Sequence, residues 1–201
     1  MKRLSTYLAI GLLTMCTTVN AATFAFNEDL LAGSDPSDSV RQIIATNQRN
    51  VNFNIASDVF AFDPAVFGVS QFLFTTDLSG NVPASGVNVV VLQDPAPLNA
   101  GVAADRIAAA ITDPGPGFFI YFNTNLDLPR LVFSRDLSDA TADLAVLARL
   151  TNLSGAPGFA QLPNFTETNF APIPEPSSLL LTSADTLLTC VVALRRRRPR
   201  A

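Results

Sequence analysis

Short apolar runs, bounded by turn-forming residues, dominate the middle of the chain. Phenylalanines pair at a spacing of two at Phe24 and Phe26, and again at positions 60 and 62 and at 72 and 74. A period of two places such side chains on one face of a strand. Residues 51–55 alternate in the same way, and apolar runs follow at 87–92, 118–122 and 131–133. With the Gly, Pro, Asn and Ser residues between them, these runs predict about six strands.

Three other stretches, at 39–44, 99–112 and 138–150, have helical spacing. The first begins with a capping-box pattern, Ser39 with Gln42, and the third repeats leucine every three residues after a capping Ser138 or Asp139. The middle helix lies between two strong strand patterns, and the turn at 127–129 separates two apolar runs as in a hairpin. We therefore expect an α+β domain with a mixed or antiparallel sheet and about three helices. An all-β sandwich is the alternative.

The N-terminus has the three parts of a secretory signal peptide. Lys2 and Arg3 are positive, residues 4–15 are mostly apolar, and Val19 and Ala21 occupy the −3 and −1 positions of a cleavage site. We expect signal peptidase to cleave after Ala21. The apolar run is short for a membrane span, and Met15 before Cys16 disfavours a lipoprotein.

The C-terminus also has three parts in a fixed order. Pro174-Glu175-Pro176 precedes an apolar run at 179–194, and the basic cluster Arg195, Arg196, Arg197 and Arg198 follows the run. Arginines beside a span favour cytoplasmic retention of that end. Asp185 interrupts the run, and a carboxylate near mid-span costs about 2.5–3.5 kcal/mol on insertion scales.

This order of motif, span and basic cluster resembles the PEP-CTERM sorting signal of Gram-negative bacteria. The resemblance covers about the last 30 residues. It implies export through the Sec translocon, transient anchoring in the inner membrane, and processing near Pro174-Glu175-Pro176 by the membrane protease-transpeptidase exosortase. Proteins of this type are associated with exopolysaccharide and biofilm, so the resemblance implies a cell-surface or extracellular destination. The prolines would keep the motif extended, and Glu175 would supply a recognised charge.

These signals divide the chain into four parts. We expect a signal peptide at 1–21, an extracytoplasmic domain at 22–154, a linker at 155–172 that is rich in Pro, Gly, Asn and Thr, and the sorting signal at 173–201. Residues 22–173 contain six arginines, no lysine and fifteen acidic residues, a formal net charge of −9 against −4 for the whole chain. This charge is opposite to what nucleic-acid binding needs.

The residues between the signals lack several catalytic side chains. The chain has no histidine, and both cysteines, Cys16 and Cys190, lie in the terminal signals. This composition excludes catalytic triads with histidine, cysteine nucleophiles and His-ligated zinc, and it leaves no internal disulfide. No catalytic residues and no cofactor are therefore predicted.

Carboxylate chemistry remains open. Two acids can support a glycosidase, and exopolysaccharide is a natural substrate, but no pair is singled out. A structural calcium ion is a second option, at Asp136, Asp139 and Asp143 or at Asp35 and Asp38, although neither set has the spacing of an EF-hand loop. The sequence favours a structural or adhesive protein of the cell envelope or matrix. The alternatives are a glycosidase and a plain C-terminally anchored envelope protein.

Overall fold

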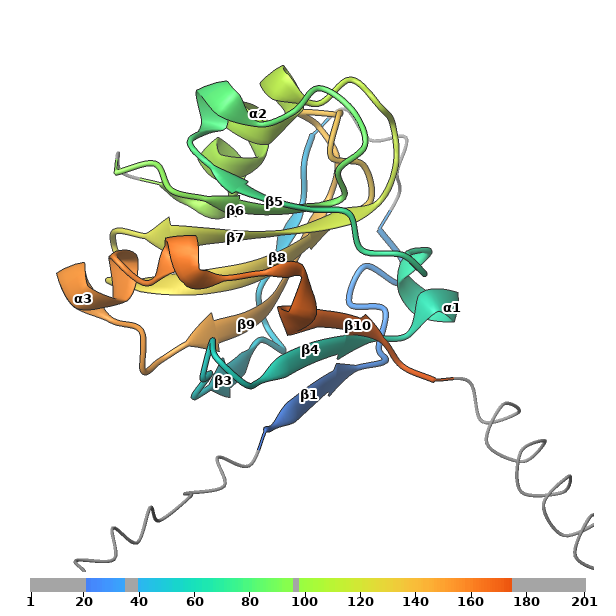
Figure 1. Cartoon of the computed structure of the whole chain (residues 1–201). Helices are drawn as coiled ribbons and strands as arrows, with labels where there is room; N and C mark the ends of the chain where they lie inside the picture. Colours follow the sequence, from blue (N-terminus) through green and yellow to red (C-terminus); the bar gives the residue numbers. More distant parts are fainter. Residues whose placement is uncertain (1–20, 35–39, 96–97, 175–201) are drawn as a thin grey trace, which may run out of the picture.

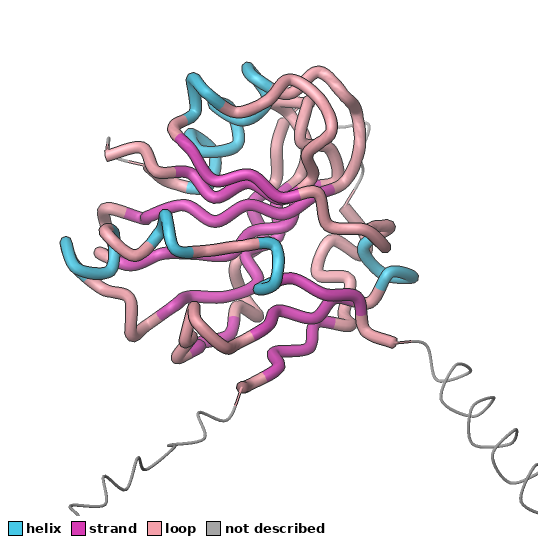
Figure 2. Tube along the Cα trace, viewed as in Figure 1, coloured by secondary structure: helices cyan, strands magenta, loops and turns pink. Residues whose placement is uncertain are grey.

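The computed structural model describes residues 21–34, 40–95 and 98–174. In these residues a large mixed sheet separates an α-helix on one face from a small parallel sheet on the other (Figure 1). The strands fill the middle of the molecule, whereas the helices are short and peripheral (Figure 2). The elements in chain order are β1 (Thr23–Phe26), β2 (Ile43–Ile44), β3 (Arg49–Val51), β4 (Val59–Phe62), α1 (Pro64–Phe67), β5 (Phe74–Asp77), η1 (Ser79–Asn81), β6 (Val89–Leu92), α2 (Ala100–Ala110), β7 (Gly117–Asn123), β8 (Leu128–Ser134), β9 (Leu144–Leu150), α3 (Gly155–Phe159), η2 (Leu162–Asn164), η3 (Glu167–Asn169) and β10 (Phe170–Pro172).

The large sheet has the strand order β2-β9-β8-β7-β6-β5, and β3 also pairs with β9. Its strands are parallel to one another except β8, which is antiparallel to both neighbours. The predicted strand–helix–strand unit is confirmed as β6-α2-β7, with Asn99 capping α2 by accepting a hydrogen bond from the Val102 amide. The predicted hairpin is confirmed as β7-β8, and its turn holds Asp127 at a φ of 56°.

The large sheet is buried on both faces. Along β7, Phe118, Ile120 and Phe122 face the small sheet, while Phe119 and Tyr121 face α2. All seven residues of this strand are buried, which explains why its sequence reads as a continuous apolar run.

The small sheet has β4 in its centre, with β1 and β10 parallel to it on either side. Its phenylalanines pack into the core against the large sheet. Phe60 stacks on Phe53 at 4.0 Å between ring centroids, and Phe62 lies 3.9 Å from Phe118 of β7. Both apolar clusters of the described residues are built from side chains between Phe24 and Phe170.

The structure therefore has mixed α and β character, with a mixed sheet and three α-helices in its described part, as expected. Two of the three predicted helices are wrong. Residues 144–150 form the central strand β9, where leucines buried on both faces imitate helical spacing. Ile43 and Ile44 form β2 and pair with Leu144 and Ala145, while Ser39 of the predicted cap lies outside the described residues.

The linker predicted at 155–172 is also wrong. This segment contains α3, two 3₁₀ turns and β10, and it buries Leu162, Phe165 and Phe170 in the core beneath the large sheet. In Figure 1 it is the orange segment that crosses in front of the large sheet and ends beside β4. The polar and proline-rich composition reflects its tight turns, and the three apolar side chains fix it to the domain.

Replacing Phe165 with alanine tests whether this segment belongs to the folded unit. The ring is fully buried and stacks on Phe53 at 5.7 Å. We expect Phe165→Ala to lower the free energy of unfolding of residues 22–173 by about 3–5 kcal/mol, measured by urea denaturation. Leu126→Ala, at a 40% exposed position, is the control and should cost less than about 0.5 kcal/mol. A similarly small loss for Phe165→Ala would restore the linker interpretation.

Candidate functional site

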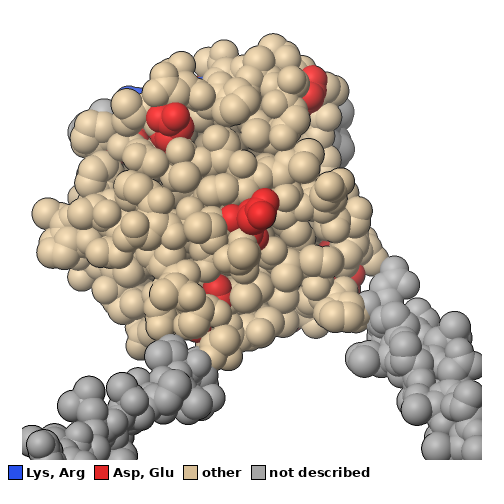
Figure 3. Space-filling view, in the orientation of Figure 1, with Lys and Arg blue, Asp and Glu red and all other residues tan. Residues whose placement is uncertain are grey.

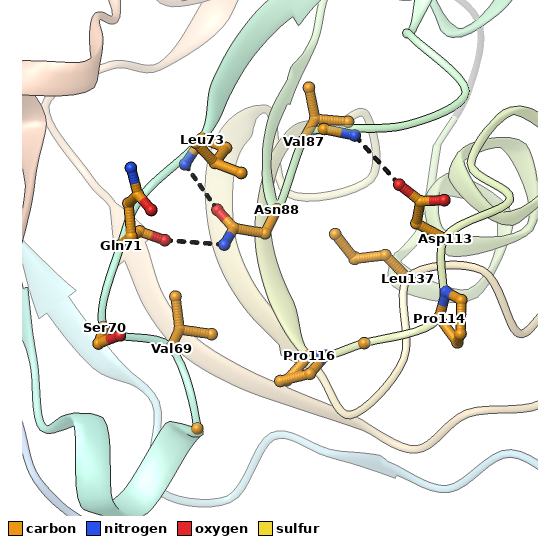
Figure 4. Close-up of a pocket in the computed structure, with 13 residues that line it drawn as sticks. Val69, Ser70, Gln71, Leu73, Val87, Asn88, Asp113, Pro114, Pro116 and Leu137 are labelled. Atoms are coloured by element: carbon orange, nitrogen blue, oxygen red, sulfur yellow. Dashed lines mark hydrogen bonds between the residues drawn. The ribbon is translucent and has the colours of Figure 1, made fainter.

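A cleft of about 330 Å³ opens at the N-terminal ends of β5, β6 and β7. Three backbone segments line it: 68–73 after α1, 86–88 before β6, and 113–116 before β7 (Figure 4). Gly68, Gly86 and Gly115 each adopt a positive φ there, which a side chain would strain.

Two polar side chains fix the walls of this cleft. Asn88 accepts a hydrogen bond from the Leu73 amide and donates one to the Gln71 carbonyl, both at 2.8 Å, which joins two segments (Figure 4). Asp113 accepts a hydrogen bond from the Gly86 amide at 3.2 Å. Of the residues that line the cleft, Asp113 is the one carboxylate. Because a glycosidase needs two carboxylates across the scissile bond, this cleft does not supply the pair by itself.

Three of the acids considered for calcium, Asp136, Asp139 and Asp143, accept hydrogen bonds from backbone amides. Asp136 accepts hydrogen bonds from the Gly115 and Ser138 amides. Asp139 accepts from the Thr141 amide and hydroxyl, which lower the pKa of its carboxyl, and Asp143 accepts from the Gln42 amide. In the described part of the chain no three His, Cys, Asp or Glu residues converge as a metal site. Asp35 and Asp38 lie outside it.

The predicted signal-peptide cleavage point lies against a buried acid. The Ala22 amide donates a hydrogen bond to Asp58 Oδ1 at 2.9 Å, and the Ala22 carbonyl accepts one from the Val59 amide. Asp58 is only 4% exposed and also accepts hydrogen bonds from the Asn54 amide and the Ser57 hydroxyl. Burial alone raises the pKa of Asp58, but these three hydrogen bonds outweigh burial and lower it. Sequence reasoning missed Asp58, because an isolated acid between two strand patterns carries no signal of its own.

The predicted sorting motif follows the last strand directly. The Ile173 amide donates to the Phe62 carbonyl at 2.7 Å, and exposed Pro174 comes next. Glu175, Pro176, the predicted span at 179–194 and the four arginines lie outside the described residues, as do Lys2 and Arg3. Within the described ranges, no helix combines the length and the apolar character that crossing a membrane requires.

Acidic side chains lie singly over the visible surface, with arginine almost absent from this view (Figure 3). Residues 22–173 have a high negative charge, and the separation of the acids on this face lowers the repulsion between them, because isolated like charges repel less than clustered ones.

Comparison with known proteins adds no family assignment. No protein-family model, no curated protein and no solved structure matches this chain.

Asn88→Ala tests whether the cleft is held by this side chain. The substitution leaves the Leu73 amide and the Gln71 carbonyl without their partner, and we expect a loss of about 1–2 kcal/mol in the free energy of unfolding. Gln71→Ala removes an exposed amide side chain from the same cleft and should change stability by less than about 0.5 kcal/mol. Equal losses in the two variants would contradict the bracing role of Asn88.

Proposed function

We propose that this chain is an exported protein of the cell envelope or extracellular matrix, processed by signal peptidase and by exosortase. Its role is structural or adhesive, in association with exopolysaccharide. The resemblance of the C-terminus to a PEP-CTERM signal supports the route. The acidic, cysteine-free composition of residues 22–173 suits a soluble body that relies on its core for stability outside the cell.

The observation that carries the proposal is the agreement between the fold and the two predicted processing points. The first strand begins at Thr23, two residues after Ala21, and the last ends at Pro172, two residues before Pro174. Cleavage at both points would leave the two apolar clusters of the described residues intact.

Asp58 gives the N-terminal cleavage a structural consequence. In the precursor, the neutral backbone amide of Ala22 donates a hydrogen bond to this carboxylate. After cleavage behind Ala21, the same nitrogen becomes an α-ammonium group beside a buried carboxylate. The amide already makes a hydrogen bond to a charged acceptor, and the ammonium group adds an opposite charge at the same position, so the pair gains Coulombic attraction. Maturation would therefore stabilise the attachment of β1 to β4.

The pair formed by the Ala22 ammonium group and the Asp58 carboxylate predicts a pH-dependent difference in stability. The two proteins compared are residues 22–173 with a free Ala22 amine and the same residues acetylated at that amine. At pH 6.5 we expect the free form to be about 1–2 kcal/mol more stable to urea. The pair holds the amine charged, so the folded pKa rises above the ordinary value of about 7.7–8.0. The advantage is thus complete below that value and is lost as the pH rises through the folded pKa.

Asp58→Asn is the matched control for that experiment. Because the folded pKa of Asp58 is lowered, its own contribution is present above the ordinary carboxyl value and disappears as the pH falls through the folded pKa. In Asp58→Asn, acetylation should leave stability unchanged between pH 6 and 10. An acetylation effect of equal size with and without Asp58 would show that the carboxylate does not receive the ammonium group.

Processing at the other end is tested by Glu175→Ala in the full chain. The protein is expressed in a Gram-negative host that carries an exosortase and in an isogenic strain that lacks it, with Ser177→Ala as the control. We expect mass spectrometry to find Ala22 as the first residue and, in the exosortase strain, loss of the segment from Arg195 to the end. Glu175→Ala should retain that segment and Ser177→Ala should lose it. Retention by the unaltered chain in both strains would instead indicate a plain anchored envelope protein.

A further inference from the structure

A row of polar residues crosses the α2-facing side of the large sheet at one end. The residues are cross-strand partners on four adjacent strands: Tyr121 of β7, Arg130 of β8, Arg149 of β9 and Asn50 of β3. Cross-strand partners project from the same face of a sheet, with Cβ atoms about 4.5–5.5 Å apart. Tyr121 belongs to the apolar cluster under α2, which identifies that face.

A β-bulge places the second arginine in this row. Leu147 and Ala148 are consecutive, yet both pack toward the small sheet, and the register between β8 and β9 shifts between Leu131 and Val132. Regular alternation after Val146 would have put Ala148, not Arg149, beside Arg130. Bulges commonly redirect a side chain in this way next to functional sites.

Among the described residues, neither of the two arginines forms an ion pair. Arg130 is only 9% exposed, and the ion pairs formed within the described residues involve neither Arg130 nor Arg149. Charged side chains are rarely buried to this degree without a partner, and like charges opposite each other on neighbouring strands are destabilising. By contrast, Arg41, Arg106 and Arg135 each form an ion pair with an aspartate.

Around Arg130 the hydrogen-bond donors outnumber the acceptors. Its two Nη atoms reach Gln48 Oε1 at 2.6 Å and the Tyr121 hydroxyl at 3.4 Å. That hydroxyl also accepts from Asn123 Nδ2 at 3.1 Å, so its own proton remains to be donated. The Nε atoms of Arg130 and Arg149 are buried with no hydrogen-bond partner among the described residues. The group that completes this arrangement is an acceptor with negative charge.

We propose that Arg130 and Arg149, with the Tyr121 hydroxyl, form a binding site for a carboxylate group. Two planar guanidinium groups match the bidentate geometry of carboxylates. Exposure increases along the row from buried Tyr121 and Arg130, through half-buried Arg149, to exposed Asn50. The ligand therefore enters from the β3 edge and keeps the rest of its mass in solvent. The identity of the ligand rests on the proposed association with exopolysaccharide: the carboxylate belongs to an acidic saccharide.

The test is an NMR titration of residues 22–173 that follows the arginine Nε–H signals. Trigalacturonate is the probe, and neutral maltotriose is the matched control. We expect trigalacturonate to shift the signals of Arg130 and Arg149, and maltotriose to shift neither. Arg149→Gln should weaken binding at least tenfold. Arg49→Gln, which removes an equal charge from an exposed arginine on neighbouring β3, should weaken it less than twofold.

Arg149→Lys keeps the charge and loses the planar fork, so an intermediate loss is expected; this variant also covers the case in which Arg149→Gln does not fold. Absence of any shift, or equal losses for the variants at 49 and 149, would overturn the site. Displacement of trigalacturonate by an equal concentration of inorganic sulfate would overturn the saccharide assignment in favour of a small free oxyanion. The titration uses purified protein, so its outcome is independent of whether the chain is exported and processed.

Discussion

Burial of the large sheet on both faces is the constraint on which the rest of the structure depends. β7 occupies the middle of this sheet and has no exposed residue, so each face of it requires a cover. One cover is α2, which directly precedes β7. The other is the small sheet, assembled from the two ends of the folded body and the strand β4. Residues 22–173 contain no cysteine, so this apolar contact stabilises the fold without the help of an internal disulfide.

The same constraint determines where polar chemistry can lie. Strand interiors are occupied by apolar side chains, and most polar groups are found at the strand ends and in the connecting turns. The cleft braced by Asn88 lies at such ends. The row that contains Arg130 and Arg149 differs, because it places two arginines in a layer that also contains the aliphatic and aromatic side chains under α2. A bulge in β9 is needed to bring the second arginine to that face, so this difference is built into the backbone.

Two-sided burial also explains what could be predicted from the sequence. The Phe24 and Phe60 strands, α2 and the β7-β8 hairpin follow from local pattern and turn chemistry, and they are confirmed. The leucines at 144, 147 and 150 produced a wrong helix prediction, because a strand buried on both faces lacks alternation and the bulge at 147–148 adds a shift that resembles a helical repeat. Of the candidate sites, the acids at 136, 139 and 143 were visible in the sequence, but their amide partners were not. Asp58 and the arginine row depend on pairings between distant strands, which no local pattern encodes.

Asp58 connects the two ends of the folded body. Its carboxylate accepts the hydrogen bond of the Ala22 amide at the start of β1, and its backbone carbonyl accepts one from Asn169, immediately before β10. Asn169 is buried and also donates to the Ile55 carbonyl, so the turn before β4 holds both flanking strands. β1 and β10 are parallel, and the chain therefore enters and leaves at opposite ends of the same small sheet. A change of charge at Ala22 would act on the turn that also positions β10, so the proposed cleavage after Ala21 would reinforce the strand that precedes the predicted sorting motif.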